Sequence, residues 1–205
     1  MIRAAFFAIL SLSVFVGCAQ KEPAKTEPTV IKANAKAKPL PMVEMLADFG
    51  IEKWEGNRSV DTVVVHTAHS VEGEPYEPKN VYNIFKKYNV TSHYLIGRDG
   101  VIYKLADEND LAHHAGVSKM ADGRESVNRF SIGIELINSK IDYPTRAQYI
   151  ALAKLINDIK TRYDIKFIVG HKDIAPTRKS DPWNFDFDEL AILLETQKHA
   201  KEATK

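Results

Sequence analysis

The sequence contains a single cysteine, Cys18, among its 205 residues. One cysteine excludes an intrachain disulfide and any zinc motif built from several cysteines. An excess of positive charge is also missing, since 28 Lys and Arg against 27 Asp and Glu leave a net charge of +1. Nucleic-acid-binding domains are usually strongly basic, so no nucleic-acid partner is predicted. With 44% hydrophobic and 27% charged residues, the composition is that of a globular protein, and the length suits one domain with appendages.

The apolar stretch near the N-terminus is too short to span a membrane. Residues 4–16 are uncharged, whereas a transmembrane helix needs about 20 apolar residues. The stretch follows Arg3 and ends at Gly17-Cys18, which resembles a bacterial lipoprotein signal. This resemblance predicts a signal peptide over 1–17 and a lipid on Cys18. The alternative is ordinary cleavage near Ala19, which would leave an exported protein without a lipid.

Residues 18–41 are predicted to form the lipidated cysteine and a flexible linker. Positions 21–41 hold five Lys, four Pro and only three larger aliphatic residues. Such a segment buries too little apolar surface to offset its chain entropy. We therefore expect one globular domain over 42–205. The two residues directly after Cys18 are Ala19 and Gln20 rather than the Asp that usually retains lipoproteins at the inner membrane. The lipoprotein resemblance then favours, in a Gram-negative cell, an anchor in the outer membrane that faces the periplasm.

Strand and helix signals alternate along this domain. Apolar and β-branched runs predict strands, and apolar residues spaced three and four apart predict helices. The expected strands are 62–65, 93–96, 101–105, 131–137 and 167–170. The expected helices are 78–88, one that begins at a Thr145–Gln148 capping box, and one that opens at Asp186. Interleaved strands and helices with one hairpin predict a three-layer α/β fold, a central mixed β-sheet flanked by helices on both faces.

Two of the apolar strands are expected to end in histidine, at His66 and at His171. Functional sites of open α/β sheets lie beyond the carboxyl ends of the strands, so both imidazoles are expected at one rim. Imidazole nitrogen is a common zinc ligand, and a catalytic zinc site has three protein ligands. A histidine at a strand end is also often a capped or surface side chain. The spacing alone leaves both interpretations open.

A carboxylate interrupts an apolar strand at Glu135. In the run from Ser131 to Ile137, alternation places Glu135 on the face opposite Ile132, Ile134 and Leu136. Burial of an unpaired carboxylate is costly, since even neutral polar groups cost about 2–7 kcal/mol. One interpretation is a solvated face or an ion pair with Lys or Arg. The other is a general base that faces a site, with a pKa tuned by partial burial.

The segment from His171 to Trp183 is polar, charged and contains two prolines, which is typical of a rigid loop that carries function. Asp181 precedes Pro182 and is therefore restrained to an extended geometry. Its carboxylate is a candidate oxygen ligand for the metal of His171. The ammonium of Lys179 is a candidate donor to a developing oxyanion. The alternative is a charged surface loop in which Asp181 caps a turn.

Three of these segments, 130–136 (FSIGIEL), 170–176 (GHKDIAP) and 178–182 (RKSDP), resemble the type 2 N-acetylmuramoyl-L-alanine amidases. The resemblance covers about 59–187, with the motifs in the family's order. It implies a zinc-dependent peptidoglycan amidase that shares its fold with the peptidoglycan recognition proteins. It also implies one Zn²⁺ per chain on His66, His171 and Asp181. Glu135 then matches the catalytic acid/base, and Lys179 matches the lysine that stabilises the transition state.

The resemblance also indicates which residues contact the substrate. His114-Ala115-Gly116 matches the family's substrate-side loop. Our candidate substrate contacts are His93, His114, Asn128 and Arg178, although a hairpin histidine such as His93 is more often structural. The histidines at 113 and 114 are alternatively donors that support the metal ligands. The family commonly has Trp and Gly at the positions that His113 and Trp183 occupy here.

The predicted function is hydrolysis of the amide bond between N-acetylmuramic acid and L-Ala in peptidoglycan or muropeptide fragments. Glu135 is expected to transfer the proton and Lys179 to stabilise the oxyanion. We expect an exported monomer that contacts the membrane through a lipid on Cys18. The alternative is a non-catalytic module of the same fold that recognises peptidoglycan, and such members typically lack a metal ligand or the base. A third candidate is a zinc peptidase that cuts within the stem peptide.

Overall fold

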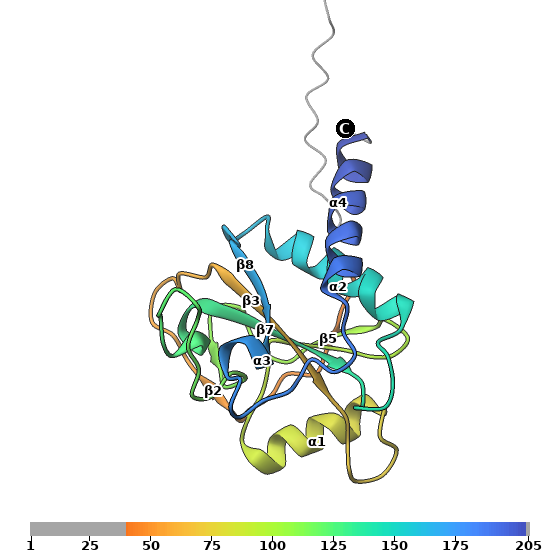
Figure 1. The fold of residues 1–205 in the computed structure, drawn as a ribbon. Coiled ribbons are helices and arrows are strands. Elements are labelled where there is room, and N and C mark those ends of the chain that lie inside the picture. The colour runs from red at the N-terminus through yellow and green to blue at the C-terminus, as the bar shows by residue number, and fades with distance from the viewer. Residues whose placement is uncertain (1–39, 204–205) are drawn as a thin grey trace, which may run out of the picture. The chain divides into compact units, whose positions relative to one another are not determined.

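The computed structural model describes residues 40–203, with side chains described as far as residue 197. The expected signal peptide, Cys18 and nearly all of the expected linker lie outside this range. None of the helices within residues 40–203 is long and apolar enough to cross a lipid bilayer. The elements, shown in Figure 1, are β1 (Val43–Glu44), β2 (Ile51–Glu52), β3 (Thr62–Ala68), α1 (Pro78–Tyr88), β4 (Tyr94–Ile96), β5 (Ile102–Lys104), β6 (Leu111–Ala112), the 3-10 helix η1 (Val127–Phe130), β7 (Ser131–Ile137), α2 (Arg146–Ile159), β8 (Phe167–Gly170), α3 (His171–Ile174) and α4 (Phe187–Ala203).

Six strands form the central sheet, in the order β1-β5-β4-β7-β3-β8. The pairs β4–β7, β7–β3 and β3–β8 are parallel, as is the edge pair β1–β5. Strands β4 and β5 form the antiparallel hairpin predicted around Gly97–Gly100. Strands β2 and β6 pair separately as a short antiparallel ladder. The main sheet is therefore mixed, as the sequence predicted.

Helices cover both faces of this sheet (Figure 1). On one face, α2 and α4 contribute Leu152 and Leu190 to a buried cluster that includes Ile134 of β7. On the other face, Phe85 of α1 packs in a second cluster with Leu95 of β4. The sheet is thus the middle of three layers, and the prediction of a three-layer α/β fold is confirmed.

Local sequence signals begin the two long helices. The hydroxyl of Thr145 accepts a hydrogen bond from the Gln148 backbone N–H at 3.2 Å, and the Gln148 side chain accepts one from the Thr145 N–H at 2.9 Å. This is the predicted capping box. The Asp186 carboxylate accepts from the backbone N–H groups of Asp188 and Glu189, which starts α4 as expected.

Three details of the sequence prediction were wrong. His66 does not end its strand, because β3 continues for two residues to Ala68. The segment after β8 does not start as a loop, because His171–Ile174 form the helical turn α3. Strands β1, β2 and β6 were not predicted, since each has two residues and such a short segment shows no periodicity.

Candidate metal centre and active site

Parallel pairing aligns three chemically active side chains across the sheet. His66 of β3 lies beside Glu135 of β7, and Val65 of β3 lies beside Gly170 of β8. His171 comes directly after Gly170 and therefore lies next to His66. Successive side chains of a strand alternate between faces, and Val65 belongs to the cluster under α2 and α4. His66 and Glu135 therefore point to the opposite face.

Two imidazoles and one carboxylate converge on this face. The Nδ1 atoms of His66 and His171 are 3.0 Å apart, and Oδ2 of Asp181 lies 3.4 Å from the first and 3.2 Å from the second. All three residues are buried. A tetrahedral zinc ion with bonds of about 2.0–2.1 Å holds its ligand atoms roughly 3.3–3.4 Å apart. The donor types and their spacing therefore fit such an ion, with a fourth position left for water or substrate.

Close backbone contacts place Asp181 beside the two histidines. The backbone N–H of Lys172 donates to the Asp181 carbonyl at 2.7 Å, and the Trp183 N–H donates to the Thr67 hydroxyl at 2.9 Å. A side chain at Gly170 would obstruct this arrangement, because its Cβ would lie 2.7 Å from Cδ of Pro182. The returning segment thus sits directly against the start of α3, which brings the carboxylate to His171.

The protonation of the cluster suits a cation. Burial of the ring lowers the pKa of His66 to about 4, so that the imidazole is neutral at pH 7. Burial alone would raise the pKa of Asp181, but the adjacent imidazoles of His171 and His66 outweigh it and hold that pKa below its ordinary value. Neutral imidazole and ionised carboxylate are the forms in which these groups bind metals.

Glu135 and Lys179 complete the charged groups of the site. Oε2 of Glu135 is buried and has no hydrogen-bond partner among the described residues. Burial, and then the negative charge of Asp181, raise the pKa of Glu135 well above its ordinary value, while the charge of Lys179 acts in the opposite direction. A cation on Asp181 would cancel part of this shift. Glu135 is therefore a desolvated carboxyl poised to exchange a proton.

His171, Asp181, Glu135 and Lys179 line a cavity of about 850 Å³. Three of the four predicted substrate contacts, His114, Asn128 and Arg178, also line it. The Asn128 side-chain oxygen accepts from the Ala115 N–H at 2.8 Å, and Arg178 donates to the Ala115 carbonyl at 2.7 Å. Both residues hold the loop that follows β6, and Arg178 stays exposed to the cavity. Its use as a substrate contact stays a prediction.

His93 lies apart from this cavity and is completely buried. Its Nδ1 accepts a hydrogen bond from the Gly133 backbone N–H at 3.0 Å, and its Nε2 contacts the Asp110 carbonyl at 3.1 Å and Arg58 at 2.9 Å. Both ring nitrogens are therefore used within the protein. The ring has no surface to offer a substrate, and we withdraw His93 as a substrate contact.

Some residues of the site carried no clear signal in the sequence. Thr67, next to His66, anchors Trp183 through its hydroxyl. Trp183 and His69 both line the cavity, with ring centroids 5.7 Å apart. In the sequence, the indication of an aromatic side chain at this cavity was Trp183 itself, two residues after Asp181.

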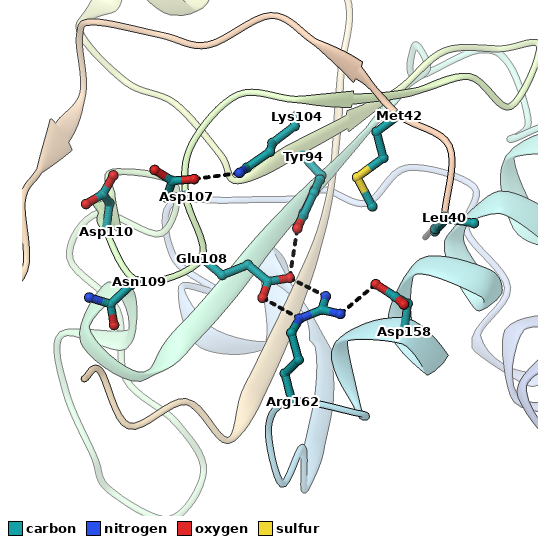
Figure 2. Close-up of a pocket in the computed structure, with 10 residues that line it drawn as sticks. All are labelled: Leu40, Met42, Tyr94, Lys104, Asp107, Glu108, Asn109, Asp110, Asp158 and Arg162. Atoms are coloured by element: carbon teal, nitrogen blue, oxygen red, sulfur yellow. Dashed lines mark hydrogen bonds and ion pairs between the residues drawn. The ribbon is translucent and has the colours of Figure 1, made fainter. Parts of the chain in front are cut away.

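A second cavity of about 800 Å³ lies elsewhere on the domain (Figure 2). Glu108 forms two hydrogen bonds with Arg162, at 2.8 and 2.9 Å, and accepts a third from the Tyr94 hydroxyl at 2.7 Å. Arg162 also pairs with Asp158 at 2.7 Å, and Lys104 pairs with Asp107 at 2.5 Å. Each carboxylate of this cavity is paired with a cationic side chain, Asp110 with Lys53 among them, so we assign it a structural role.

Comparisons with known proteins agree with this geometry. A family model described as N-acetylmuramoyl-L-alanine amidase matches residues 56–184. The 1,6-anhydro-N-acetylmuramyl-L-alanine amidase AmpD of Haemophilus influenzae is 46% identical over 99 residues, which are 47% of this chain and 53% of that protein. The chain spans between about half and two thirds of the length of the AmpD relatives it matches.

Solved structures extend the likeness to the fold. A crystal structure of an AmpD derivative superimposes with a TM-score of 0.64 at 33% identity, over 75% of this chain and 94% of that one. AmiD of Escherichia coli, in complex with the substrate anhydro-N-acetylmuramic acid-L-Ala-D-gamma-Glu-L-Lys, superimposes with a TM-score of 0.59 at 31% identity, over 69% of this chain and 60% of that one. The family match covers more than half of the chain and includes His66, Glu135, His171, Lys179 and Asp181. The chain therefore belongs to the type 2 N-acetylmuramoyl-L-alanine amidase family.

Proposed function

We propose that this protein binds one Zn²⁺ at His66, His171 and Asp181 and hydrolyses the amide bond between N-acetylmuramic acid and L-Ala in peptidoglycan or its fragments. The observation that carries the proposal is the convergence of three buried ligand atoms, 3.0 to 3.4 Å apart, beside the cavity that the unpartnered Glu135 lines with His171 and Asp181. Family membership and the muropeptide bound by AmiD support the choice of bond.

The residues divide the work of the reaction. When bound, zinc supplies Lewis acidity, which polarises a carbonyl and lowers the pKa of a water from ~15.7 to about 7. Glu135 accepts a proton from the water whose oxygen adds to the lactyl carbonyl carbon. Glu135 then returns the proton to the L-Ala nitrogen as the carbon–nitrogen bond breaks. Lys179 donates to the oxygen that carries negative charge between the two steps.

The positions of Glu135 and Lys179 support these roles. Oε2 of Glu135 is buried without a partner, and burial raises the pKa of this carboxyl, so the protonated form that must deliver a proton to the leaving amine is accessible. Lys179 is half-buried, lines the same cavity and forms no salt bridge with any of residues 40–197. An unpaired ammonium is free to meet the charge that develops on the substrate.

A purely recognising module of the same fold is the alternative. Such a module needs neither the base nor the complete ligand set, whereas this chain retains all three ligands in one cluster and lines one cavity with His171, Asp181, Glu135 and Lys179. No feature of the described residues favours binding without cleavage.

In the decisive experiment, purified sacculi and anhydro-muropeptides are digested with the zinc-loaded protein, and the products are identified by mass spectrometry. We expect free stem peptides that begin with L-Ala, at one zinc per chain. Chelator-treated protein and Glu135→Gln are the controls: the first should release none, and the second at least about 100-fold less than the wild type. Zinc binding without product would overturn the amidase in favour of recognition. Products cut within the stem would identify a peptidase instead.

We further propose that the protein is exported, anchored in the outer membrane through a lipid on Cys18, and monomeric. The sequence of residues 1–20 supports this location. Mass spectrometry of the mature N-terminal peptide is expected to show a lipidated Cys18, and Cys18→Ala is expected to move the protein from the membrane fraction to the soluble periplasm. An unmodified N-terminus near Ala19 would contradict the anchor.

A further inference from the structure

A buried chain of hydrogen bonds runs from the proposed metal ligand His66 into the core of the domain. Nε2 of His66 lies 3.1 Å from Nδ1 of His114. Nε2 of His114 lies 3.3 Å from the hydroxyl of Ser131, and this hydroxyl lies 2.7 Å from the Val127 carbonyl. His66, His114 and Ser131, whose side chains form these hydrogen bonds, are all buried. The contacts therefore form one continuous line from a metal ligand to the backbone.

The direction of this chain is set at its inner end. A carbonyl only accepts, so the short contact to Val127 takes the proton of the Ser131 hydroxyl. The Ser131 oxygen then accepts from Nε2–H of His114, whose Nδ1 carries no proton and accepts from Nε2–H of His66. The remaining nitrogen of His66, Nδ1, is left with a lone pair that faces His171 and Asp181. The reverse order would deprive the Val127 carbonyl of its 2.7 Å donor.

The second histidine ligand is oriented from the same loop. Nε2 of His171 lies 3.1 Å from the Ala115 carbonyl, which only accepts, so this nitrogen carries the proton and Nδ1 of His171 does not. The neighbouring residues His114 and Ala115 thus each fix one histidine in the same tautomer. Asn128 and Arg178 hold this loop through the Ala115 N–H and carbonyl.

The sheet is shaped to admit the His114 ring. A Cβ atom at Gly133 would lie 2.4 Å from Cγ of His114, so only glycine at this point of β7 leaves room for the imidazole. His114 is 8% exposed, and both of its ring nitrogens have partners within the protein. No nitrogen of His114 remains to meet a substrate.

We propose that His114 is a positioning residue that selects the Nδ1-coordinating tautomer of His66, with Ser131 fixing the orientation of His114, and that it is not a substrate contact. The proposal rests on the proposed function only in that the cluster binds a divalent cation. Partners that orient a metal-bound histidine typically change metal affinity by about 10- to 100-fold.

The test uses the full chain with three variants of this series of hydrogen bonds from His66 through His114 and Ser131 to Val127, here called the relay, and with one control variant. His114→Ala removes the acceptor, and zinc affinity measured by chelator competition is expected to fall by about 10- to 100-fold. His114→Asn keeps an acceptor oxygen near the position of Nδ1 and is expected to restore most of the affinity. Ser131→Ala is expected to give a smaller loss. The control is His113→Ala, since the ring of His113 lines the same cavity but pairs with Glu52, at 2.8 Å, and with none of the three ligands, and its zinc affinity should match that of the wild type.

A second readout records the tautomer without metal. Long-range ¹H–¹⁵N NMR of the chelator-treated wild type is expected to show His66 protonated at Nε2, and His114→Ala should show a mixture of the two tautomers. Wild-type zinc affinity in His114→Ala, or a raised KM with unchanged affinity, would overturn the proposal and leave the amidase assignment intact. A wild-type protein that binds no zinc would refute the proposed function, while the tautomer measurement would still test the relay.

Discussion

The domain has two polar cavities of similar size, about 800 and 850 Å³, and they differ in how their charges are matched. In the cavity of Figure 2, each carboxylate meets a cationic side chain, as Glu108 meets Arg162 and Asp110 meets Lys53. In the larger cavity, Glu135 has a buried oxygen without a partner, and the ligand atoms of the cluster face one another. Polarity and volume therefore do not mark a site. A buried carboxylate oxygen without a partner is the stronger mark, because buried acids with strongly perturbed pKa values cluster at functional sites.

The same substitution in the two cavities tests this difference, and its largest effect is expected at Glu135. Glu135→Gln replaces the unpartnered carboxylate with a neutral amide of similar shape. Loss of a general acid/base slows reactions by about 100- to 10,000-fold. We expect turnover to fall by such a factor while one zinc per chain remains bound, measured on the same sample. Turnover close to that of the wild type would show that Glu135 is not the base.

Removal of the unpaired cation should come next in size. Lys179→Met deletes the proposed oxyanion donor, and loss of one such donor costs about 100- to 1,000-fold in kcat. We expect kcat to fall by this amount with little change in KM. The matched control is Lys172→Met, an exposed lysine of the same segment that does not line the cavity. Equal kinetics for the two variants would remove Lys179 from the mechanism.

The buried histidines and the ion-paired carboxylates should also change the stability of the chelator-treated protein at different pH. Burial lowers the pKa of His66 to about 4 and that of His93 to about 3, against 6.5 for an ordinary histidine. The unfolded chain therefore binds more protons below pH 6.5, and folding stability falls from there as the pH drops, by up to about 1.4 kcal/mol per pH unit for each histidine. The Lys104 hydrogen bond lowers the pKa of Asp107, so that carboxylate loses its contribution only at pH values below its ordinary pKa of 3.8.

Urea unfolding of Glu135→Gln between pH 7 and pH 4 measures this effect. The Glu135→Gln variant is used because the raised pKa of Glu135 makes the wild type less stable as the pH rises, which would oppose the effect of the histidines. Stability should decline steadily below pH 6.5. A free energy of unfolding that stays constant down to pH 4 would mean that the histidines are not held neutral by burial.

The smallest effect on activity is expected in the second cavity, where each carboxylate is paired with a cation. Glu108→Gln breaks its paired hydrogen bonds with Arg162 and should lower the free energy of unfolding by about 1–3 kcal/mol, with kcat and KM unchanged. Glu55→Gln, on the exposed surface, is the control for loss of a charge and should leave stability nearly unchanged. A loss of turnover in Glu108→Gln would show that the second cavity takes part in the reaction.

The sequence predicted the helices and strands more accurately than the contacts between them. Helix α1 runs from Pro78 to Tyr88 as expected, because a proline at the first turn and an apolar stripe define it locally. His171 lies close to His66 because β3 and β8 pair in parallel register. In the sequence, only the apolar character of the two strands and the histidine near each strand's end indicated this pairing. The structure brings the three predicted ligands together, and their role in binding zinc stays a prediction.

What the sequence did not predict depends on single contacts between distant segments. His93 resembled a candidate substrate contact until the fold placed Arg58, 35 residues away, against its ring. The relay through His114 needs Gly133 on a strand 19 residues later, and a glycine in an apolar strand equally often marks a bulge or a sharp bend. Such contacts follow from the close approach of backbones, which no local pattern encodes.

The account rests on one metal ion bound by His66, His171 and Asp181. Crystals of the zinc-loaded chain, measured on either side of the zinc absorption edge, test this directly. We predict a single anomalous peak within bonding distance, about 2.0–2.2 Å, of His66 Nδ1, His171 Nδ1 and an oxygen of Asp181. No peak at this point, or a fourth protein side chain that completes the coordination, would contradict the account.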